Sequence, residues 1–218
     1  MDRTYDSILF DLDGTLWDAT NVTAATWVDV LARHSGVKCA VTIDHDTVRR
    51  YMGLTNEELA AVFFPDLPFD EAFALMCESC ALENEWLPVR GGILYDGVEE
   101  TLVRLKGEGY RLFVVSNCQA GYIEAFQQAH GFTEMFEDIE CSGRTGRCKA
   151  ENIRSIIERN GLKEPVYVGD TVSDSTAARA AGIPFIYAKY GFGELCGRGK
   201  TDDYDAAIEN IRELMANS

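Results

Sequence analysis

The sequence lacks a long apolar segment and an excess of positive charge, and each absence removes a class of function. No run of about 18 apolar residues occurs in the 218-residue chain, so we do not expect a membrane-spanning helix. Lysine and arginine number 20 against 36 aspartates and glutamates, which gives a net charge of -16. That balance argues against a broad basic surface for nucleic acid, and we predict binding to neither membranes nor nucleic acid.

The sequence also lacks a complete set of zinc ligands and a targeting segment. Cys77 and Cys80 have the spacing of half a zinc site, but no second Cys or His pair at metal spacing accompanies them. The chain passes from Met1 into its first predicted strand without a basic segment or a signal-like apolar stretch. We therefore predict a cytoplasmic protein with reduced thiols. The seven cysteines are Cys39, Cys77, Cys80, Cys118, Cys141, Cys148 and Cys196.

Strand-like and helical segments alternate from about residue 89 onward. Strands are predicted at 111–115, 136–141, 165–168 and 184–188, and helices at 97–108, 120–130, 149–160, 173–181 and near 204–216. With the first strand at 8–10, this alternation predicts βαβ units and a parallel sheet with right-handed crossovers. We expect a three-layer, Rossmann-like α/β core formed by residues 1–16 and 89–218.

The segment 17–88 has no strand-like alternation and is predicted to be helical. Apolar residues recur at helical spacing through 23–34, 56–63 and 69–86. Thr55 has the features of an N-cap, because Glu58 follows three residues later. We expect this segment to form a small α-helical cap domain inserted into the core.

Polar residues follow three of the apolar runs directly. Asp11 and Asp13 follow the first, Ser116 and Asn117 follow the run 111–115, and Asp170 follows 166–168. Taken alone, an Asp-x-Asp-Gly pattern also suits an ordinary turn or a calcium ligand. In a parallel sheet, however, the carboxyl ends of neighbouring strands meet in one crevice, which is where ligands bind. These side chains are therefore predicted to converge.

The same residues resemble, in order, the four motifs of the haloacid dehalogenase superfamily, and of its phosphatase branch in particular. The matching segments are Asp11-Leu12-Asp13-Gly14-Thr15-Leu16, Ser116-Asn117, Lys149 and Gly169-Asp170-Thr171-Val172-Ser173-Asp174. The resemblance covers essentially the whole chain and is greatest to the phosphoglycolate phosphatase group with a C1 helical cap. It implies that the Asp11 strand is central, between those that end at Ser116 and Gly169.

The resemblance also implies roles for the site residues. Asp11 would attack phosphorus, and Asp13 would protonate the leaving oxygen and later take a proton from water. The phosphoryl group would be held by Ser116, by the backbone N–H of Asn117 and by Lys149. Lys149 is followed by alanine where the family often has proline, so Arg144 or Arg147 stays an alternative for its role.

The predicted site brings together four carboxylates, those of Asp11, Asp13, Asp170 and Asp174. They would repel one another unless a cation intervened, and an all-oxygen ligand set suits Mg²⁺. On the family pattern, Asp11, the backbone carbonyl of Asp13 and Asp170 would hold the ion. Asp174 would act through water or by orienting Lys149. In the cap, Tyr51 and Gly53 occupy the position of the family's specificity loop, although a simple helix-breaking turn explains Gly53 equally well.

The expected function is a Mg²⁺-dependent phosphatase that acts on a small phosphorylated metabolite, as a monomer or a homodimer. Asp13 argues against a dehalogenase proper, which lacks a second aspartate. One alternative is a sugar phosphomutase of the β-phosphoglucomutase type, although the His-to-Lys pattern of its cap is not found at 51–59. The other alternative is a non-catalytic binding protein that retains the fold.

Overall fold

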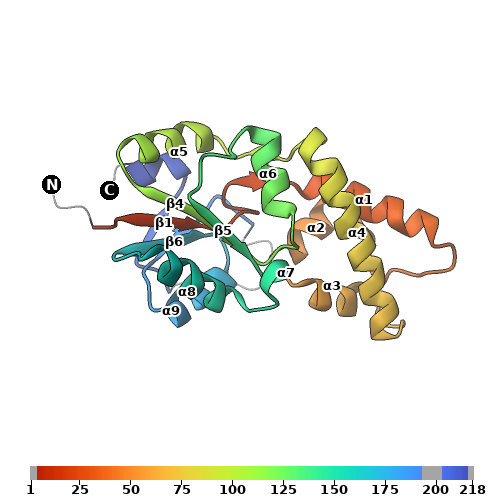
Figure 1. Ribbon diagram of the computed structural model, residues 1–218. Helices are drawn as coiled ribbons and strands as arrows, with labels where there is room; N and C mark the ends of the chain where they lie inside the picture. Colours follow the sequence, from red (N-terminus) through yellow and green to blue (C-terminus); the bar gives the residue numbers. More distant parts are fainter. Residues whose placement is uncertain (1–3, 193–202, 216–218) are drawn as a thin grey trace.

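The computed structural model describes residues 4–192 and 203–215, and a six-stranded parallel sheet forms the centre of this part of the protein (Figure 1). The strands lie in the order β5-β4-β1-β6-β7-β8. Their bounds are β1 Ser7–Phe10, β4 Arg111–Ser116, β5 Asp138–Cys141, β6 Pro165–Gly169, β7 Phe185–Ala188 and β8 Ala206–Ile208. β1 pairs with β4 on one side and with β6 on the other, which confirms the predicted central position of the strand that precedes Asp11.

Helices cover both faces of the sheet and make it the middle of three layers (Figure 1). They are α5 (Val98–Gly107) and α6 (Tyr122–His130) on one face, and α8 (Lys149–Asn160) and α9 (Val172–Ala181) on the other. Ile8 and Phe10 point to the first pair and Leu9 to the second, because successive side chains of a strand point to opposite faces. Burial on both faces explains the continuous apolar runs, and the predicted three-layer α/β core is confirmed.

Four helices follow β1 and lie together beyond the carboxyl ends of the strands, at the right of Figure 1. They are α1 (Thr20–Arg33), α2 (His45–Tyr51), α3 (Asn56–Phe63) and α4 (Phe69–Arg90). The predicted capping box is present, since the Glu58 N–H donates to Thr55 Oγ1 and the Thr55 N–H donates to Glu58 Oε2. These helices share a small apolar core of their own. We keep 17–88 as the proposed extent of the cap.

Three short features of the fold were not predicted, and one of them is the helix α7 (Ser142–Thr145). β2 (Trp17–Asp18) and β3 (Ile93–Leu94) form an antiparallel ribbon at the two points where the chain leaves and re-enters the core. α4 also continues four residues beyond its predicted end at 86, and Pro88 lies in its last turn. No helix in the described part of the chain combines the length and the apolar character needed to cross a membrane.

The predicted helix near 204–216 is wrong. Ala206–Ile208 instead form β8, which pairs in parallel with β7, and a 3-10 helix, η1 (Ile211–Met215), follows. Pairing with β8 satisfies the backbone groups along β7 that would otherwise form an open sheet edge. Residue 216 and Cys196 lie outside the described residues.

Candidate active site

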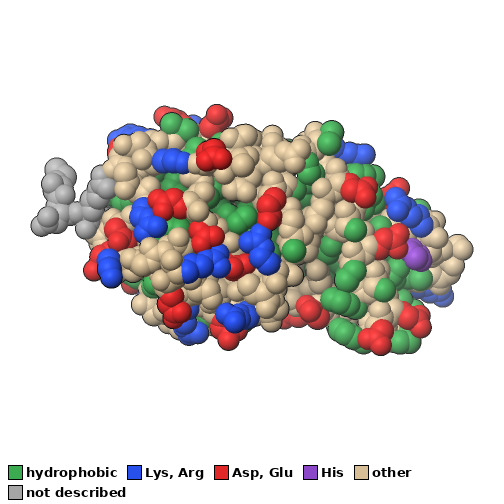
Figure 2. All heavy atoms as spheres, in the orientation of Figure 1, with side chains coloured by type: hydrophobic (Ala, Val, Ile, Leu, Met, Phe, Trp, Pro, Cys, Tyr) green, Lys and Arg blue, Asp and Glu red, His purple; other side chains and the backbone are tan. Residues whose placement is uncertain are grey.

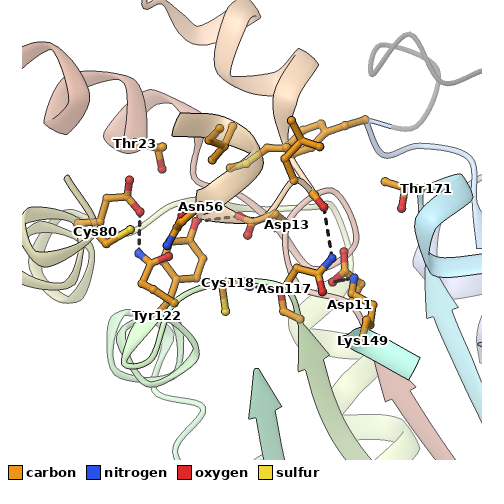
Figure 3. A pocket seen from close by; sticks show the side chains of 18 of the residues that line it. Asp11, Asp13, Thr23, Asn56, Cys80, Asn117, Cys118, Tyr122, Lys149 and Thr171 are labelled. Carbon is orange, nitrogen blue, oxygen red and sulfur yellow. Dashed lines mark hydrogen bonds and ion pairs between the residues drawn. The ribbon is translucent and has the colours of Figure 1, made fainter. Parts of the chain in front are cut away.

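Residues from three neighbouring strand ends and from the cap line a narrow cavity of about 60 Å³ (Figure 3). The structure places five of the predicted core residues on its wall, namely Asp11, Asp13, Ser116, Asn117 and Lys149. The first four follow β1 or lie at the end of β4. Parallel strand pairing therefore brings together residues that are more than a hundred positions apart in the sequence.

Lys149 begins α8 and points into the site. Its Nζ donates to Asp11 Oδ1 at 2.8 Å and to Asp174 Oδ1 at 2.5 Å. The lysine is only 5% exposed. Burial lowers its pKa, but the two carboxylates outweigh that effect and hold the pKa well above its usual value. The ammonium group is therefore charged and faces the proposed nucleophile.

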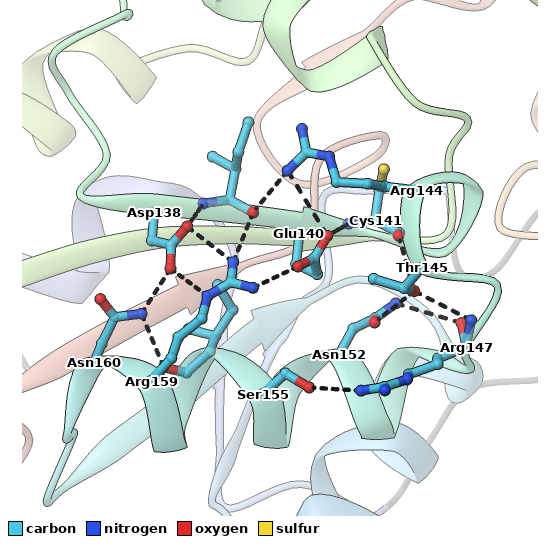
Figure 4. Close-up of polar contacts among 12 residues, drawn as sticks. Asp138, Glu140, Cys141, Arg144, Thr145, Arg147, Asn152, Ser155, Arg159 and Asn160 are labelled. Atoms are coloured by element: carbon cyan, nitrogen blue, oxygen red, sulfur yellow. Dashed lines mark hydrogen bonds and ion pairs between the residues drawn. The ribbon is translucent and has the colours of Figure 1, made fainter.

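The two alternative arginines are exposed, and their polar contacts are drawn in Figure 4. Arg144 forms an ion pair with Glu124, and Arg147 donates to Ser155 Oγ at 3.5 Å. Basic side chains on this face of the molecule alternate with acidic ones, as Figure 2 shows. The structure thus places Lys149, and neither arginine, beside Asp11.

Three buried carboxylates form a cluster next to this lysine. Oxygens of Asp11, Asp170 and Asp174 lie within 4.8 Å of one another. Burial, and then the charge of Asp174, raises the pKa of Asp11 to about 6, and the pKa of Asp170 is also raised, by burial and by both neighbours. One ammonium group cannot balance three carboxylates, and the all-oxygen donor set suits a divalent metal ion.

A tight turn after β1 makes room for Asp170. Gly14 has a φ of 84°, and a Cβ at this position would lie 2.3 Å from Asp170 Oδ2. The same oxygen accepts the backbone N–H of Phe192 at 2.6 Å, and Thr15 donates to Oδ1 at 3.4 Å. The Asp170 carboxylate is therefore held in one orientation by the turn that carries the first motif.

Asp174 is oriented by the start of α9. Its Oδ2 accepts the backbone N–H of Thr171 at 2.9 Å and the Thr171 hydroxyl at 2.6 Å, which completes a capping box. This leaves Oδ1 for Lys149. The placement agrees with the expected orienting role, although Asp174 also belongs to the acidic cluster.

Asp13 has a partner that sequence reasoning missed. The Tyr122 hydroxyl, at the start of α6, donates to Asp13 Oδ1 at 2.9 Å. Burial, and then the charge of Asp11, holds the pKa of Asp13 well above its usual range. The raised pKa favours the protonated form of Asp13 beside the proposed nucleophile. The position of Tyr122, six residues after the second strand end, is the only signal that the sequence offers for it.

The cap contacts Asn117, which belongs to the second of the four motifs. Asn117 Nδ2 donates to the backbone oxygen of Gly53 at 3.3 Å, and Asn117 Oδ1 accepts from Ser142 Oγ at 3.0 Å. Gly53 lines the cavity, as expected for a specificity loop. Tyr51 does not belong to the lining, because its ring packs edge-on against Phe63 at 5.3 Å between centroids, within the apolar core of the cap.

The cap residues that line the cavity, among them Thr23, Trp27, Gly53 and Glu83, form what we call its cap wall. Glu83 on this wall is a buried acid that sequence reasoning missed. Glu83 is 4% exposed and accepts from Trp27 Nε1 at 2.5 Å and from Gln119 Nε2 at 2.8 Å. Burial raises its pKa to about 7, although both hydrogen bonds oppose the shift. Its spacing of four residues from Ser79 and from Leu87, both buried on α4, was the available signal.

A wider groove of about 1090 Å³ adjoins the cavity and shares Gly53, Asn117 and Lys149 with it. It runs between the cap helices and the start of α8, and α9 forms part of its far side. The groove therefore lies next to the cavity that Asp11 lines.

Comparison with known proteins agrees with this arrangement. Residues 8–188 match the family model described as haloacid dehalogenase-like hydrolase. A 5′-nucleotidase of Pseudomonas aeruginosa is 30% identical over 97% of this chain and 96% of its own length. A phosphoglycolate phosphatase of Colwellia psychrerythraea is 29% identical over 85% of this chain and 84% of its own. The solved structure of a haloacid dehalogenase-like family protein from Streptococcus pneumoniae has the same fold, with a TM-score of 0.79 at 21% identity over 98% of both chains.

Proposed function

Because the chain belongs to the haloacid dehalogenase-like hydrolase family and is a hydrolase of phosphoric monoester bonds, we propose that it acts on a small phosphorylated metabolite through a phosphoaspartate on Asp11. The proposed substrate class is a small phosphomonoester, and several relatives are phosphoglycolate phosphatases. One observation carries the proposal: Asp11, Asp13 and Lys149 line one buried cavity, with the Lys149 ammonium group 2.8 Å from the Asp11 carboxylate.

Mg²⁺ is the proposed cofactor. The carboxylates of Asp11 and Asp170 and the backbone carbonyl of Asp13 would hold it, and the ion would supply positive charge beside the phosphoryl oxygens. The excess of buried carboxylates over ammonium groups supports a cation here. Asp174 is engaged by Lys149 and Thr171, and its proposed role is to orient the lysine.

In the first step, Asp11 forms a bond from a carboxylate oxygen to phosphorus as the ester bond breaks. The leaving oxygen takes a proton from Asp13, whose raised pKa favours the protonated form and whose other oxygen is held by Tyr122. Ser116, the backbone N–H of Asn117 and Lys149 would bind the phosphoryl oxygens as negative charge shifts among them. The products are an alcohol and an acyl phosphate on Asp11.

In the second step, water attacks phosphorus and gives a proton to Asp13, which is by then a carboxylate. The bond between Asp11 and phosphorus breaks, and inorganic phosphate leaves. A phosphomutase would instead return the phosphoryl group to a sugar, so the release of inorganic phosphate separates the two outcomes. The cytoplasmic location, the monomeric or homodimeric state and the absence of nucleic-acid binding stay predictions.

The test is phosphate release from a panel that includes phosphoglycolate, sugar phosphates, nucleotides and pyrophosphate, with Mg²⁺ or with a chelator. We expect turnover that requires the metal, and a loss of about 10⁴-fold or more in Asp11→Asn, because the nucleophile is removed. Asp66→Asn makes the same chemical change at an exposed site and should behave as the wild type.

A covalent readout completes the test. Protein quenched in acid during turnover should carry a phosphoryl group on Asp11 that hydroxylamine removes, because acyl phosphates react with amines. Full activity in Asp11→Asn, or turnover without such an adduct, would refute the mechanism.

A further inference from the structure

The cap wall presents a buried carboxyl group, that of Glu83, to the cavity that Asp13 also lines. Glu83 lines the cavity together with Asp13, the proposed proton donor to the leaving oxygen. Burial and the charge of Asp11 are the larger causes of the raised Asp13 pKa, and the charge of Glu83 adds to them. Glu83 is therefore close enough for its charge to act on the leaving-group side of the site.

Both partners of Glu83 are neutral. Trp27 and Gln119 each donate one hydrogen bond to it, and they occupy different oxygens, Oε1 and Oε2. A carboxylate oxygen accepts more than one hydrogen bond, so each oxygen retains acceptor capacity for a ligand. A buried carboxylate without a cation is costly, and a hydrogen-bond donor on the substrate would offset part of that cost.

The described lining of the cavity has few positive groups to balance the charge of a carboxylate on a ligand. Among the described residues that line it, Lys149 is the only basic one, and it is bonded to Asp11 and Asp174. A substrate with a carboxylate on its leaving group, as in phosphoglycolate, would bring a second negative charge toward Glu83. Repulsion between like charges in a water-poor cavity disfavours that substrate.

A second polar group on the same wall points to a polar leaving group. Thr23, on α1, is 2% exposed, and its hydroxyl has no hydrogen-bond partner within the described part of the chain. Its side chain faces the cavity in Figure 3. Buried hydroxyl groups are normally hydrogen-bonded, so an unpartnered one in a ligand cavity indicates a polar group on the ligand.

We propose that Glu83 is a specificity residue that selects a leaving group with a hydrogen-bond donor, either a hydroxyl or an ammonium group, and rejects one with a carboxylate. The inference rests on the proposed function and narrows its substrate class. It separates this protein from an enzyme whose preferred substrate is phosphoglycolate.

Four two-carbon phosphomonoesters that differ only at the end opposite the phosphate test the proposal on the wild-type protein. They are 2-hydroxyethyl phosphate, O-phosphoethanolamine, ethyl phosphate and phosphoglycolate. We expect kcat/KM for the first two to exceed that for ethyl phosphate by about tenfold, the usual value of a hydrogen bond to a charged group. Phosphoglycolate should fall below ethyl phosphate by about tenfold or more.

Glu83→Gln separates charge from hydrogen bonding. The glutamine oxygen can accept from Trp27, and Gln119 can rotate its amide to accept from the new amide group, so the local hydrogen bonds can be retained. In this variant, O-phosphoethanolamine should lose about tenfold in kcat/KM and phosphoglycolate should gain about tenfold, with 2-hydroxyethyl phosphate changed the least. Glu85→Gln, on the exposed side of α4, is the matched control and should leave the ranking unchanged.

The outcomes distinguish this inference from the function on which it rests. Metal-dependent hydrolysis that requires Asp11 but prefers phosphoglycolate over 2-hydroxyethyl phosphate would overturn the role of Glu83 and leave the phosphatase mechanism intact. An unchanged ranking in Glu83→Gln would do the same. No release from any of the four esters or from 4-nitrophenyl phosphate would refute both.

Discussion

The two walls of the cavity carry charge in different ways. On the core wall, the carboxylate of Asp11 lines the cavity and clusters with those of Asp170 and Asp174, which do not line it, beside one ammonium group. Turns and caps at the strand ends hold these carboxylates. On the cap wall, a single buried carboxylate, that of Glu83, accepts from two neutral donors. On the proposed function, the core wall would bind a metal ion and a phosphoryl group, and the cap wall would recognise the remainder of the substrate.

The walls also differ in what positions them. Core-wall residues follow adjacent parallel strands, whose register is set by continuous backbone hydrogen bonds. Cap-wall residues project from separate helices and meet the core through side-chain hydrogen bonds, such as those from Asn117 to Gly53 and from Gln119 to Glu83. Changes on the core wall should therefore affect every substrate alike, and changes on the cap wall should alter the ranking of substrates.

The largest expected effect within this comparison is that of Lys149→Ala. Removal of the ammonium group leaves the buried charges of Asp11 and Asp174 uncompensated. It would also remove the proposed contact to the phosphoryl group. We expect kcat/KM to fall by about 10³-fold for all substrates, measured as phosphate release at saturating Mg²⁺. Arg144→Ala is the control and should stay close to the wild-type rate. A near-normal rate in Lys149→Ala would move the role to another cation.

A smaller loss is expected from Gly14→Ala. The added Cβ would lie 2.3 Å from Asp170 Oδ2, so the carboxylate must shift. We expect kcat to fall by about 10²-fold, the usual result of a displacement of about 1 Å at a catalytic site. The Mg²⁺ concentration that gives half-maximal activity should rise as well.

Gly182→Ala separates this displacement from backbone strain. Gly182 has nearly the same φ, 81°, but a Cβ there would meet no atom within 4 Å. It should lower stability by about 1–2 kcal/mol, as Gly14→Ala also must, and leave kcat unchanged. Equal activity of the two variants would show that the geometry of Asp170 does not limit the reaction.

The buried carboxyl group of Glu83 on the cap wall should make the stability of the protein depend on pH. The pKa of Glu83 is raised from 4.5 to about 7 in the folded protein, so the native state binds this proton more tightly than the unfolded state does. The resulting stabilisation is complete below pH 4.5 and is lost as the pH rises through 7.

Residue 83 does not titrate in Glu83→Gln. Between pH 5 and pH 8, the free energy of unfolding of this variant should therefore rise relative to that of the wild type, by on the order of 3 kcal/mol. Denaturant unfolding at several pH values measures the difference. Asp13 and Tyr122 also face this region, but they are present in both proteins. Parallel curves for the two proteins would show that the Glu83 carboxyl group is not perturbed by folding.

Sequence reasoning predicted correctly where the residues that follow a strand end would lie. The runs before Asp11, Ser116 and Asp170 are apolar along their whole length because both faces of the sheet are covered, and the polar residues after them mark the carboxyl edge. The pattern of apolar residues was insufficient for the carboxyl-terminal segment, where a helix was predicted. Three of its residues instead form the edge strand β8, because β7 offers them backbone partners. Tertiary pairing decided that element.

The sequence by itself determined the α/β core, the order of its motifs and the residues at its strand ends, because strand period and chain order impose them. Only the tertiary structure decided which side chains complete the site. Tyr122 reaches Asp13 across 109 positions, and Gln119 reaches Glu83 across 36. Such contacts depend on how helices from separate layers dock on one another, and helix docking is set by packing that no local pattern specifies.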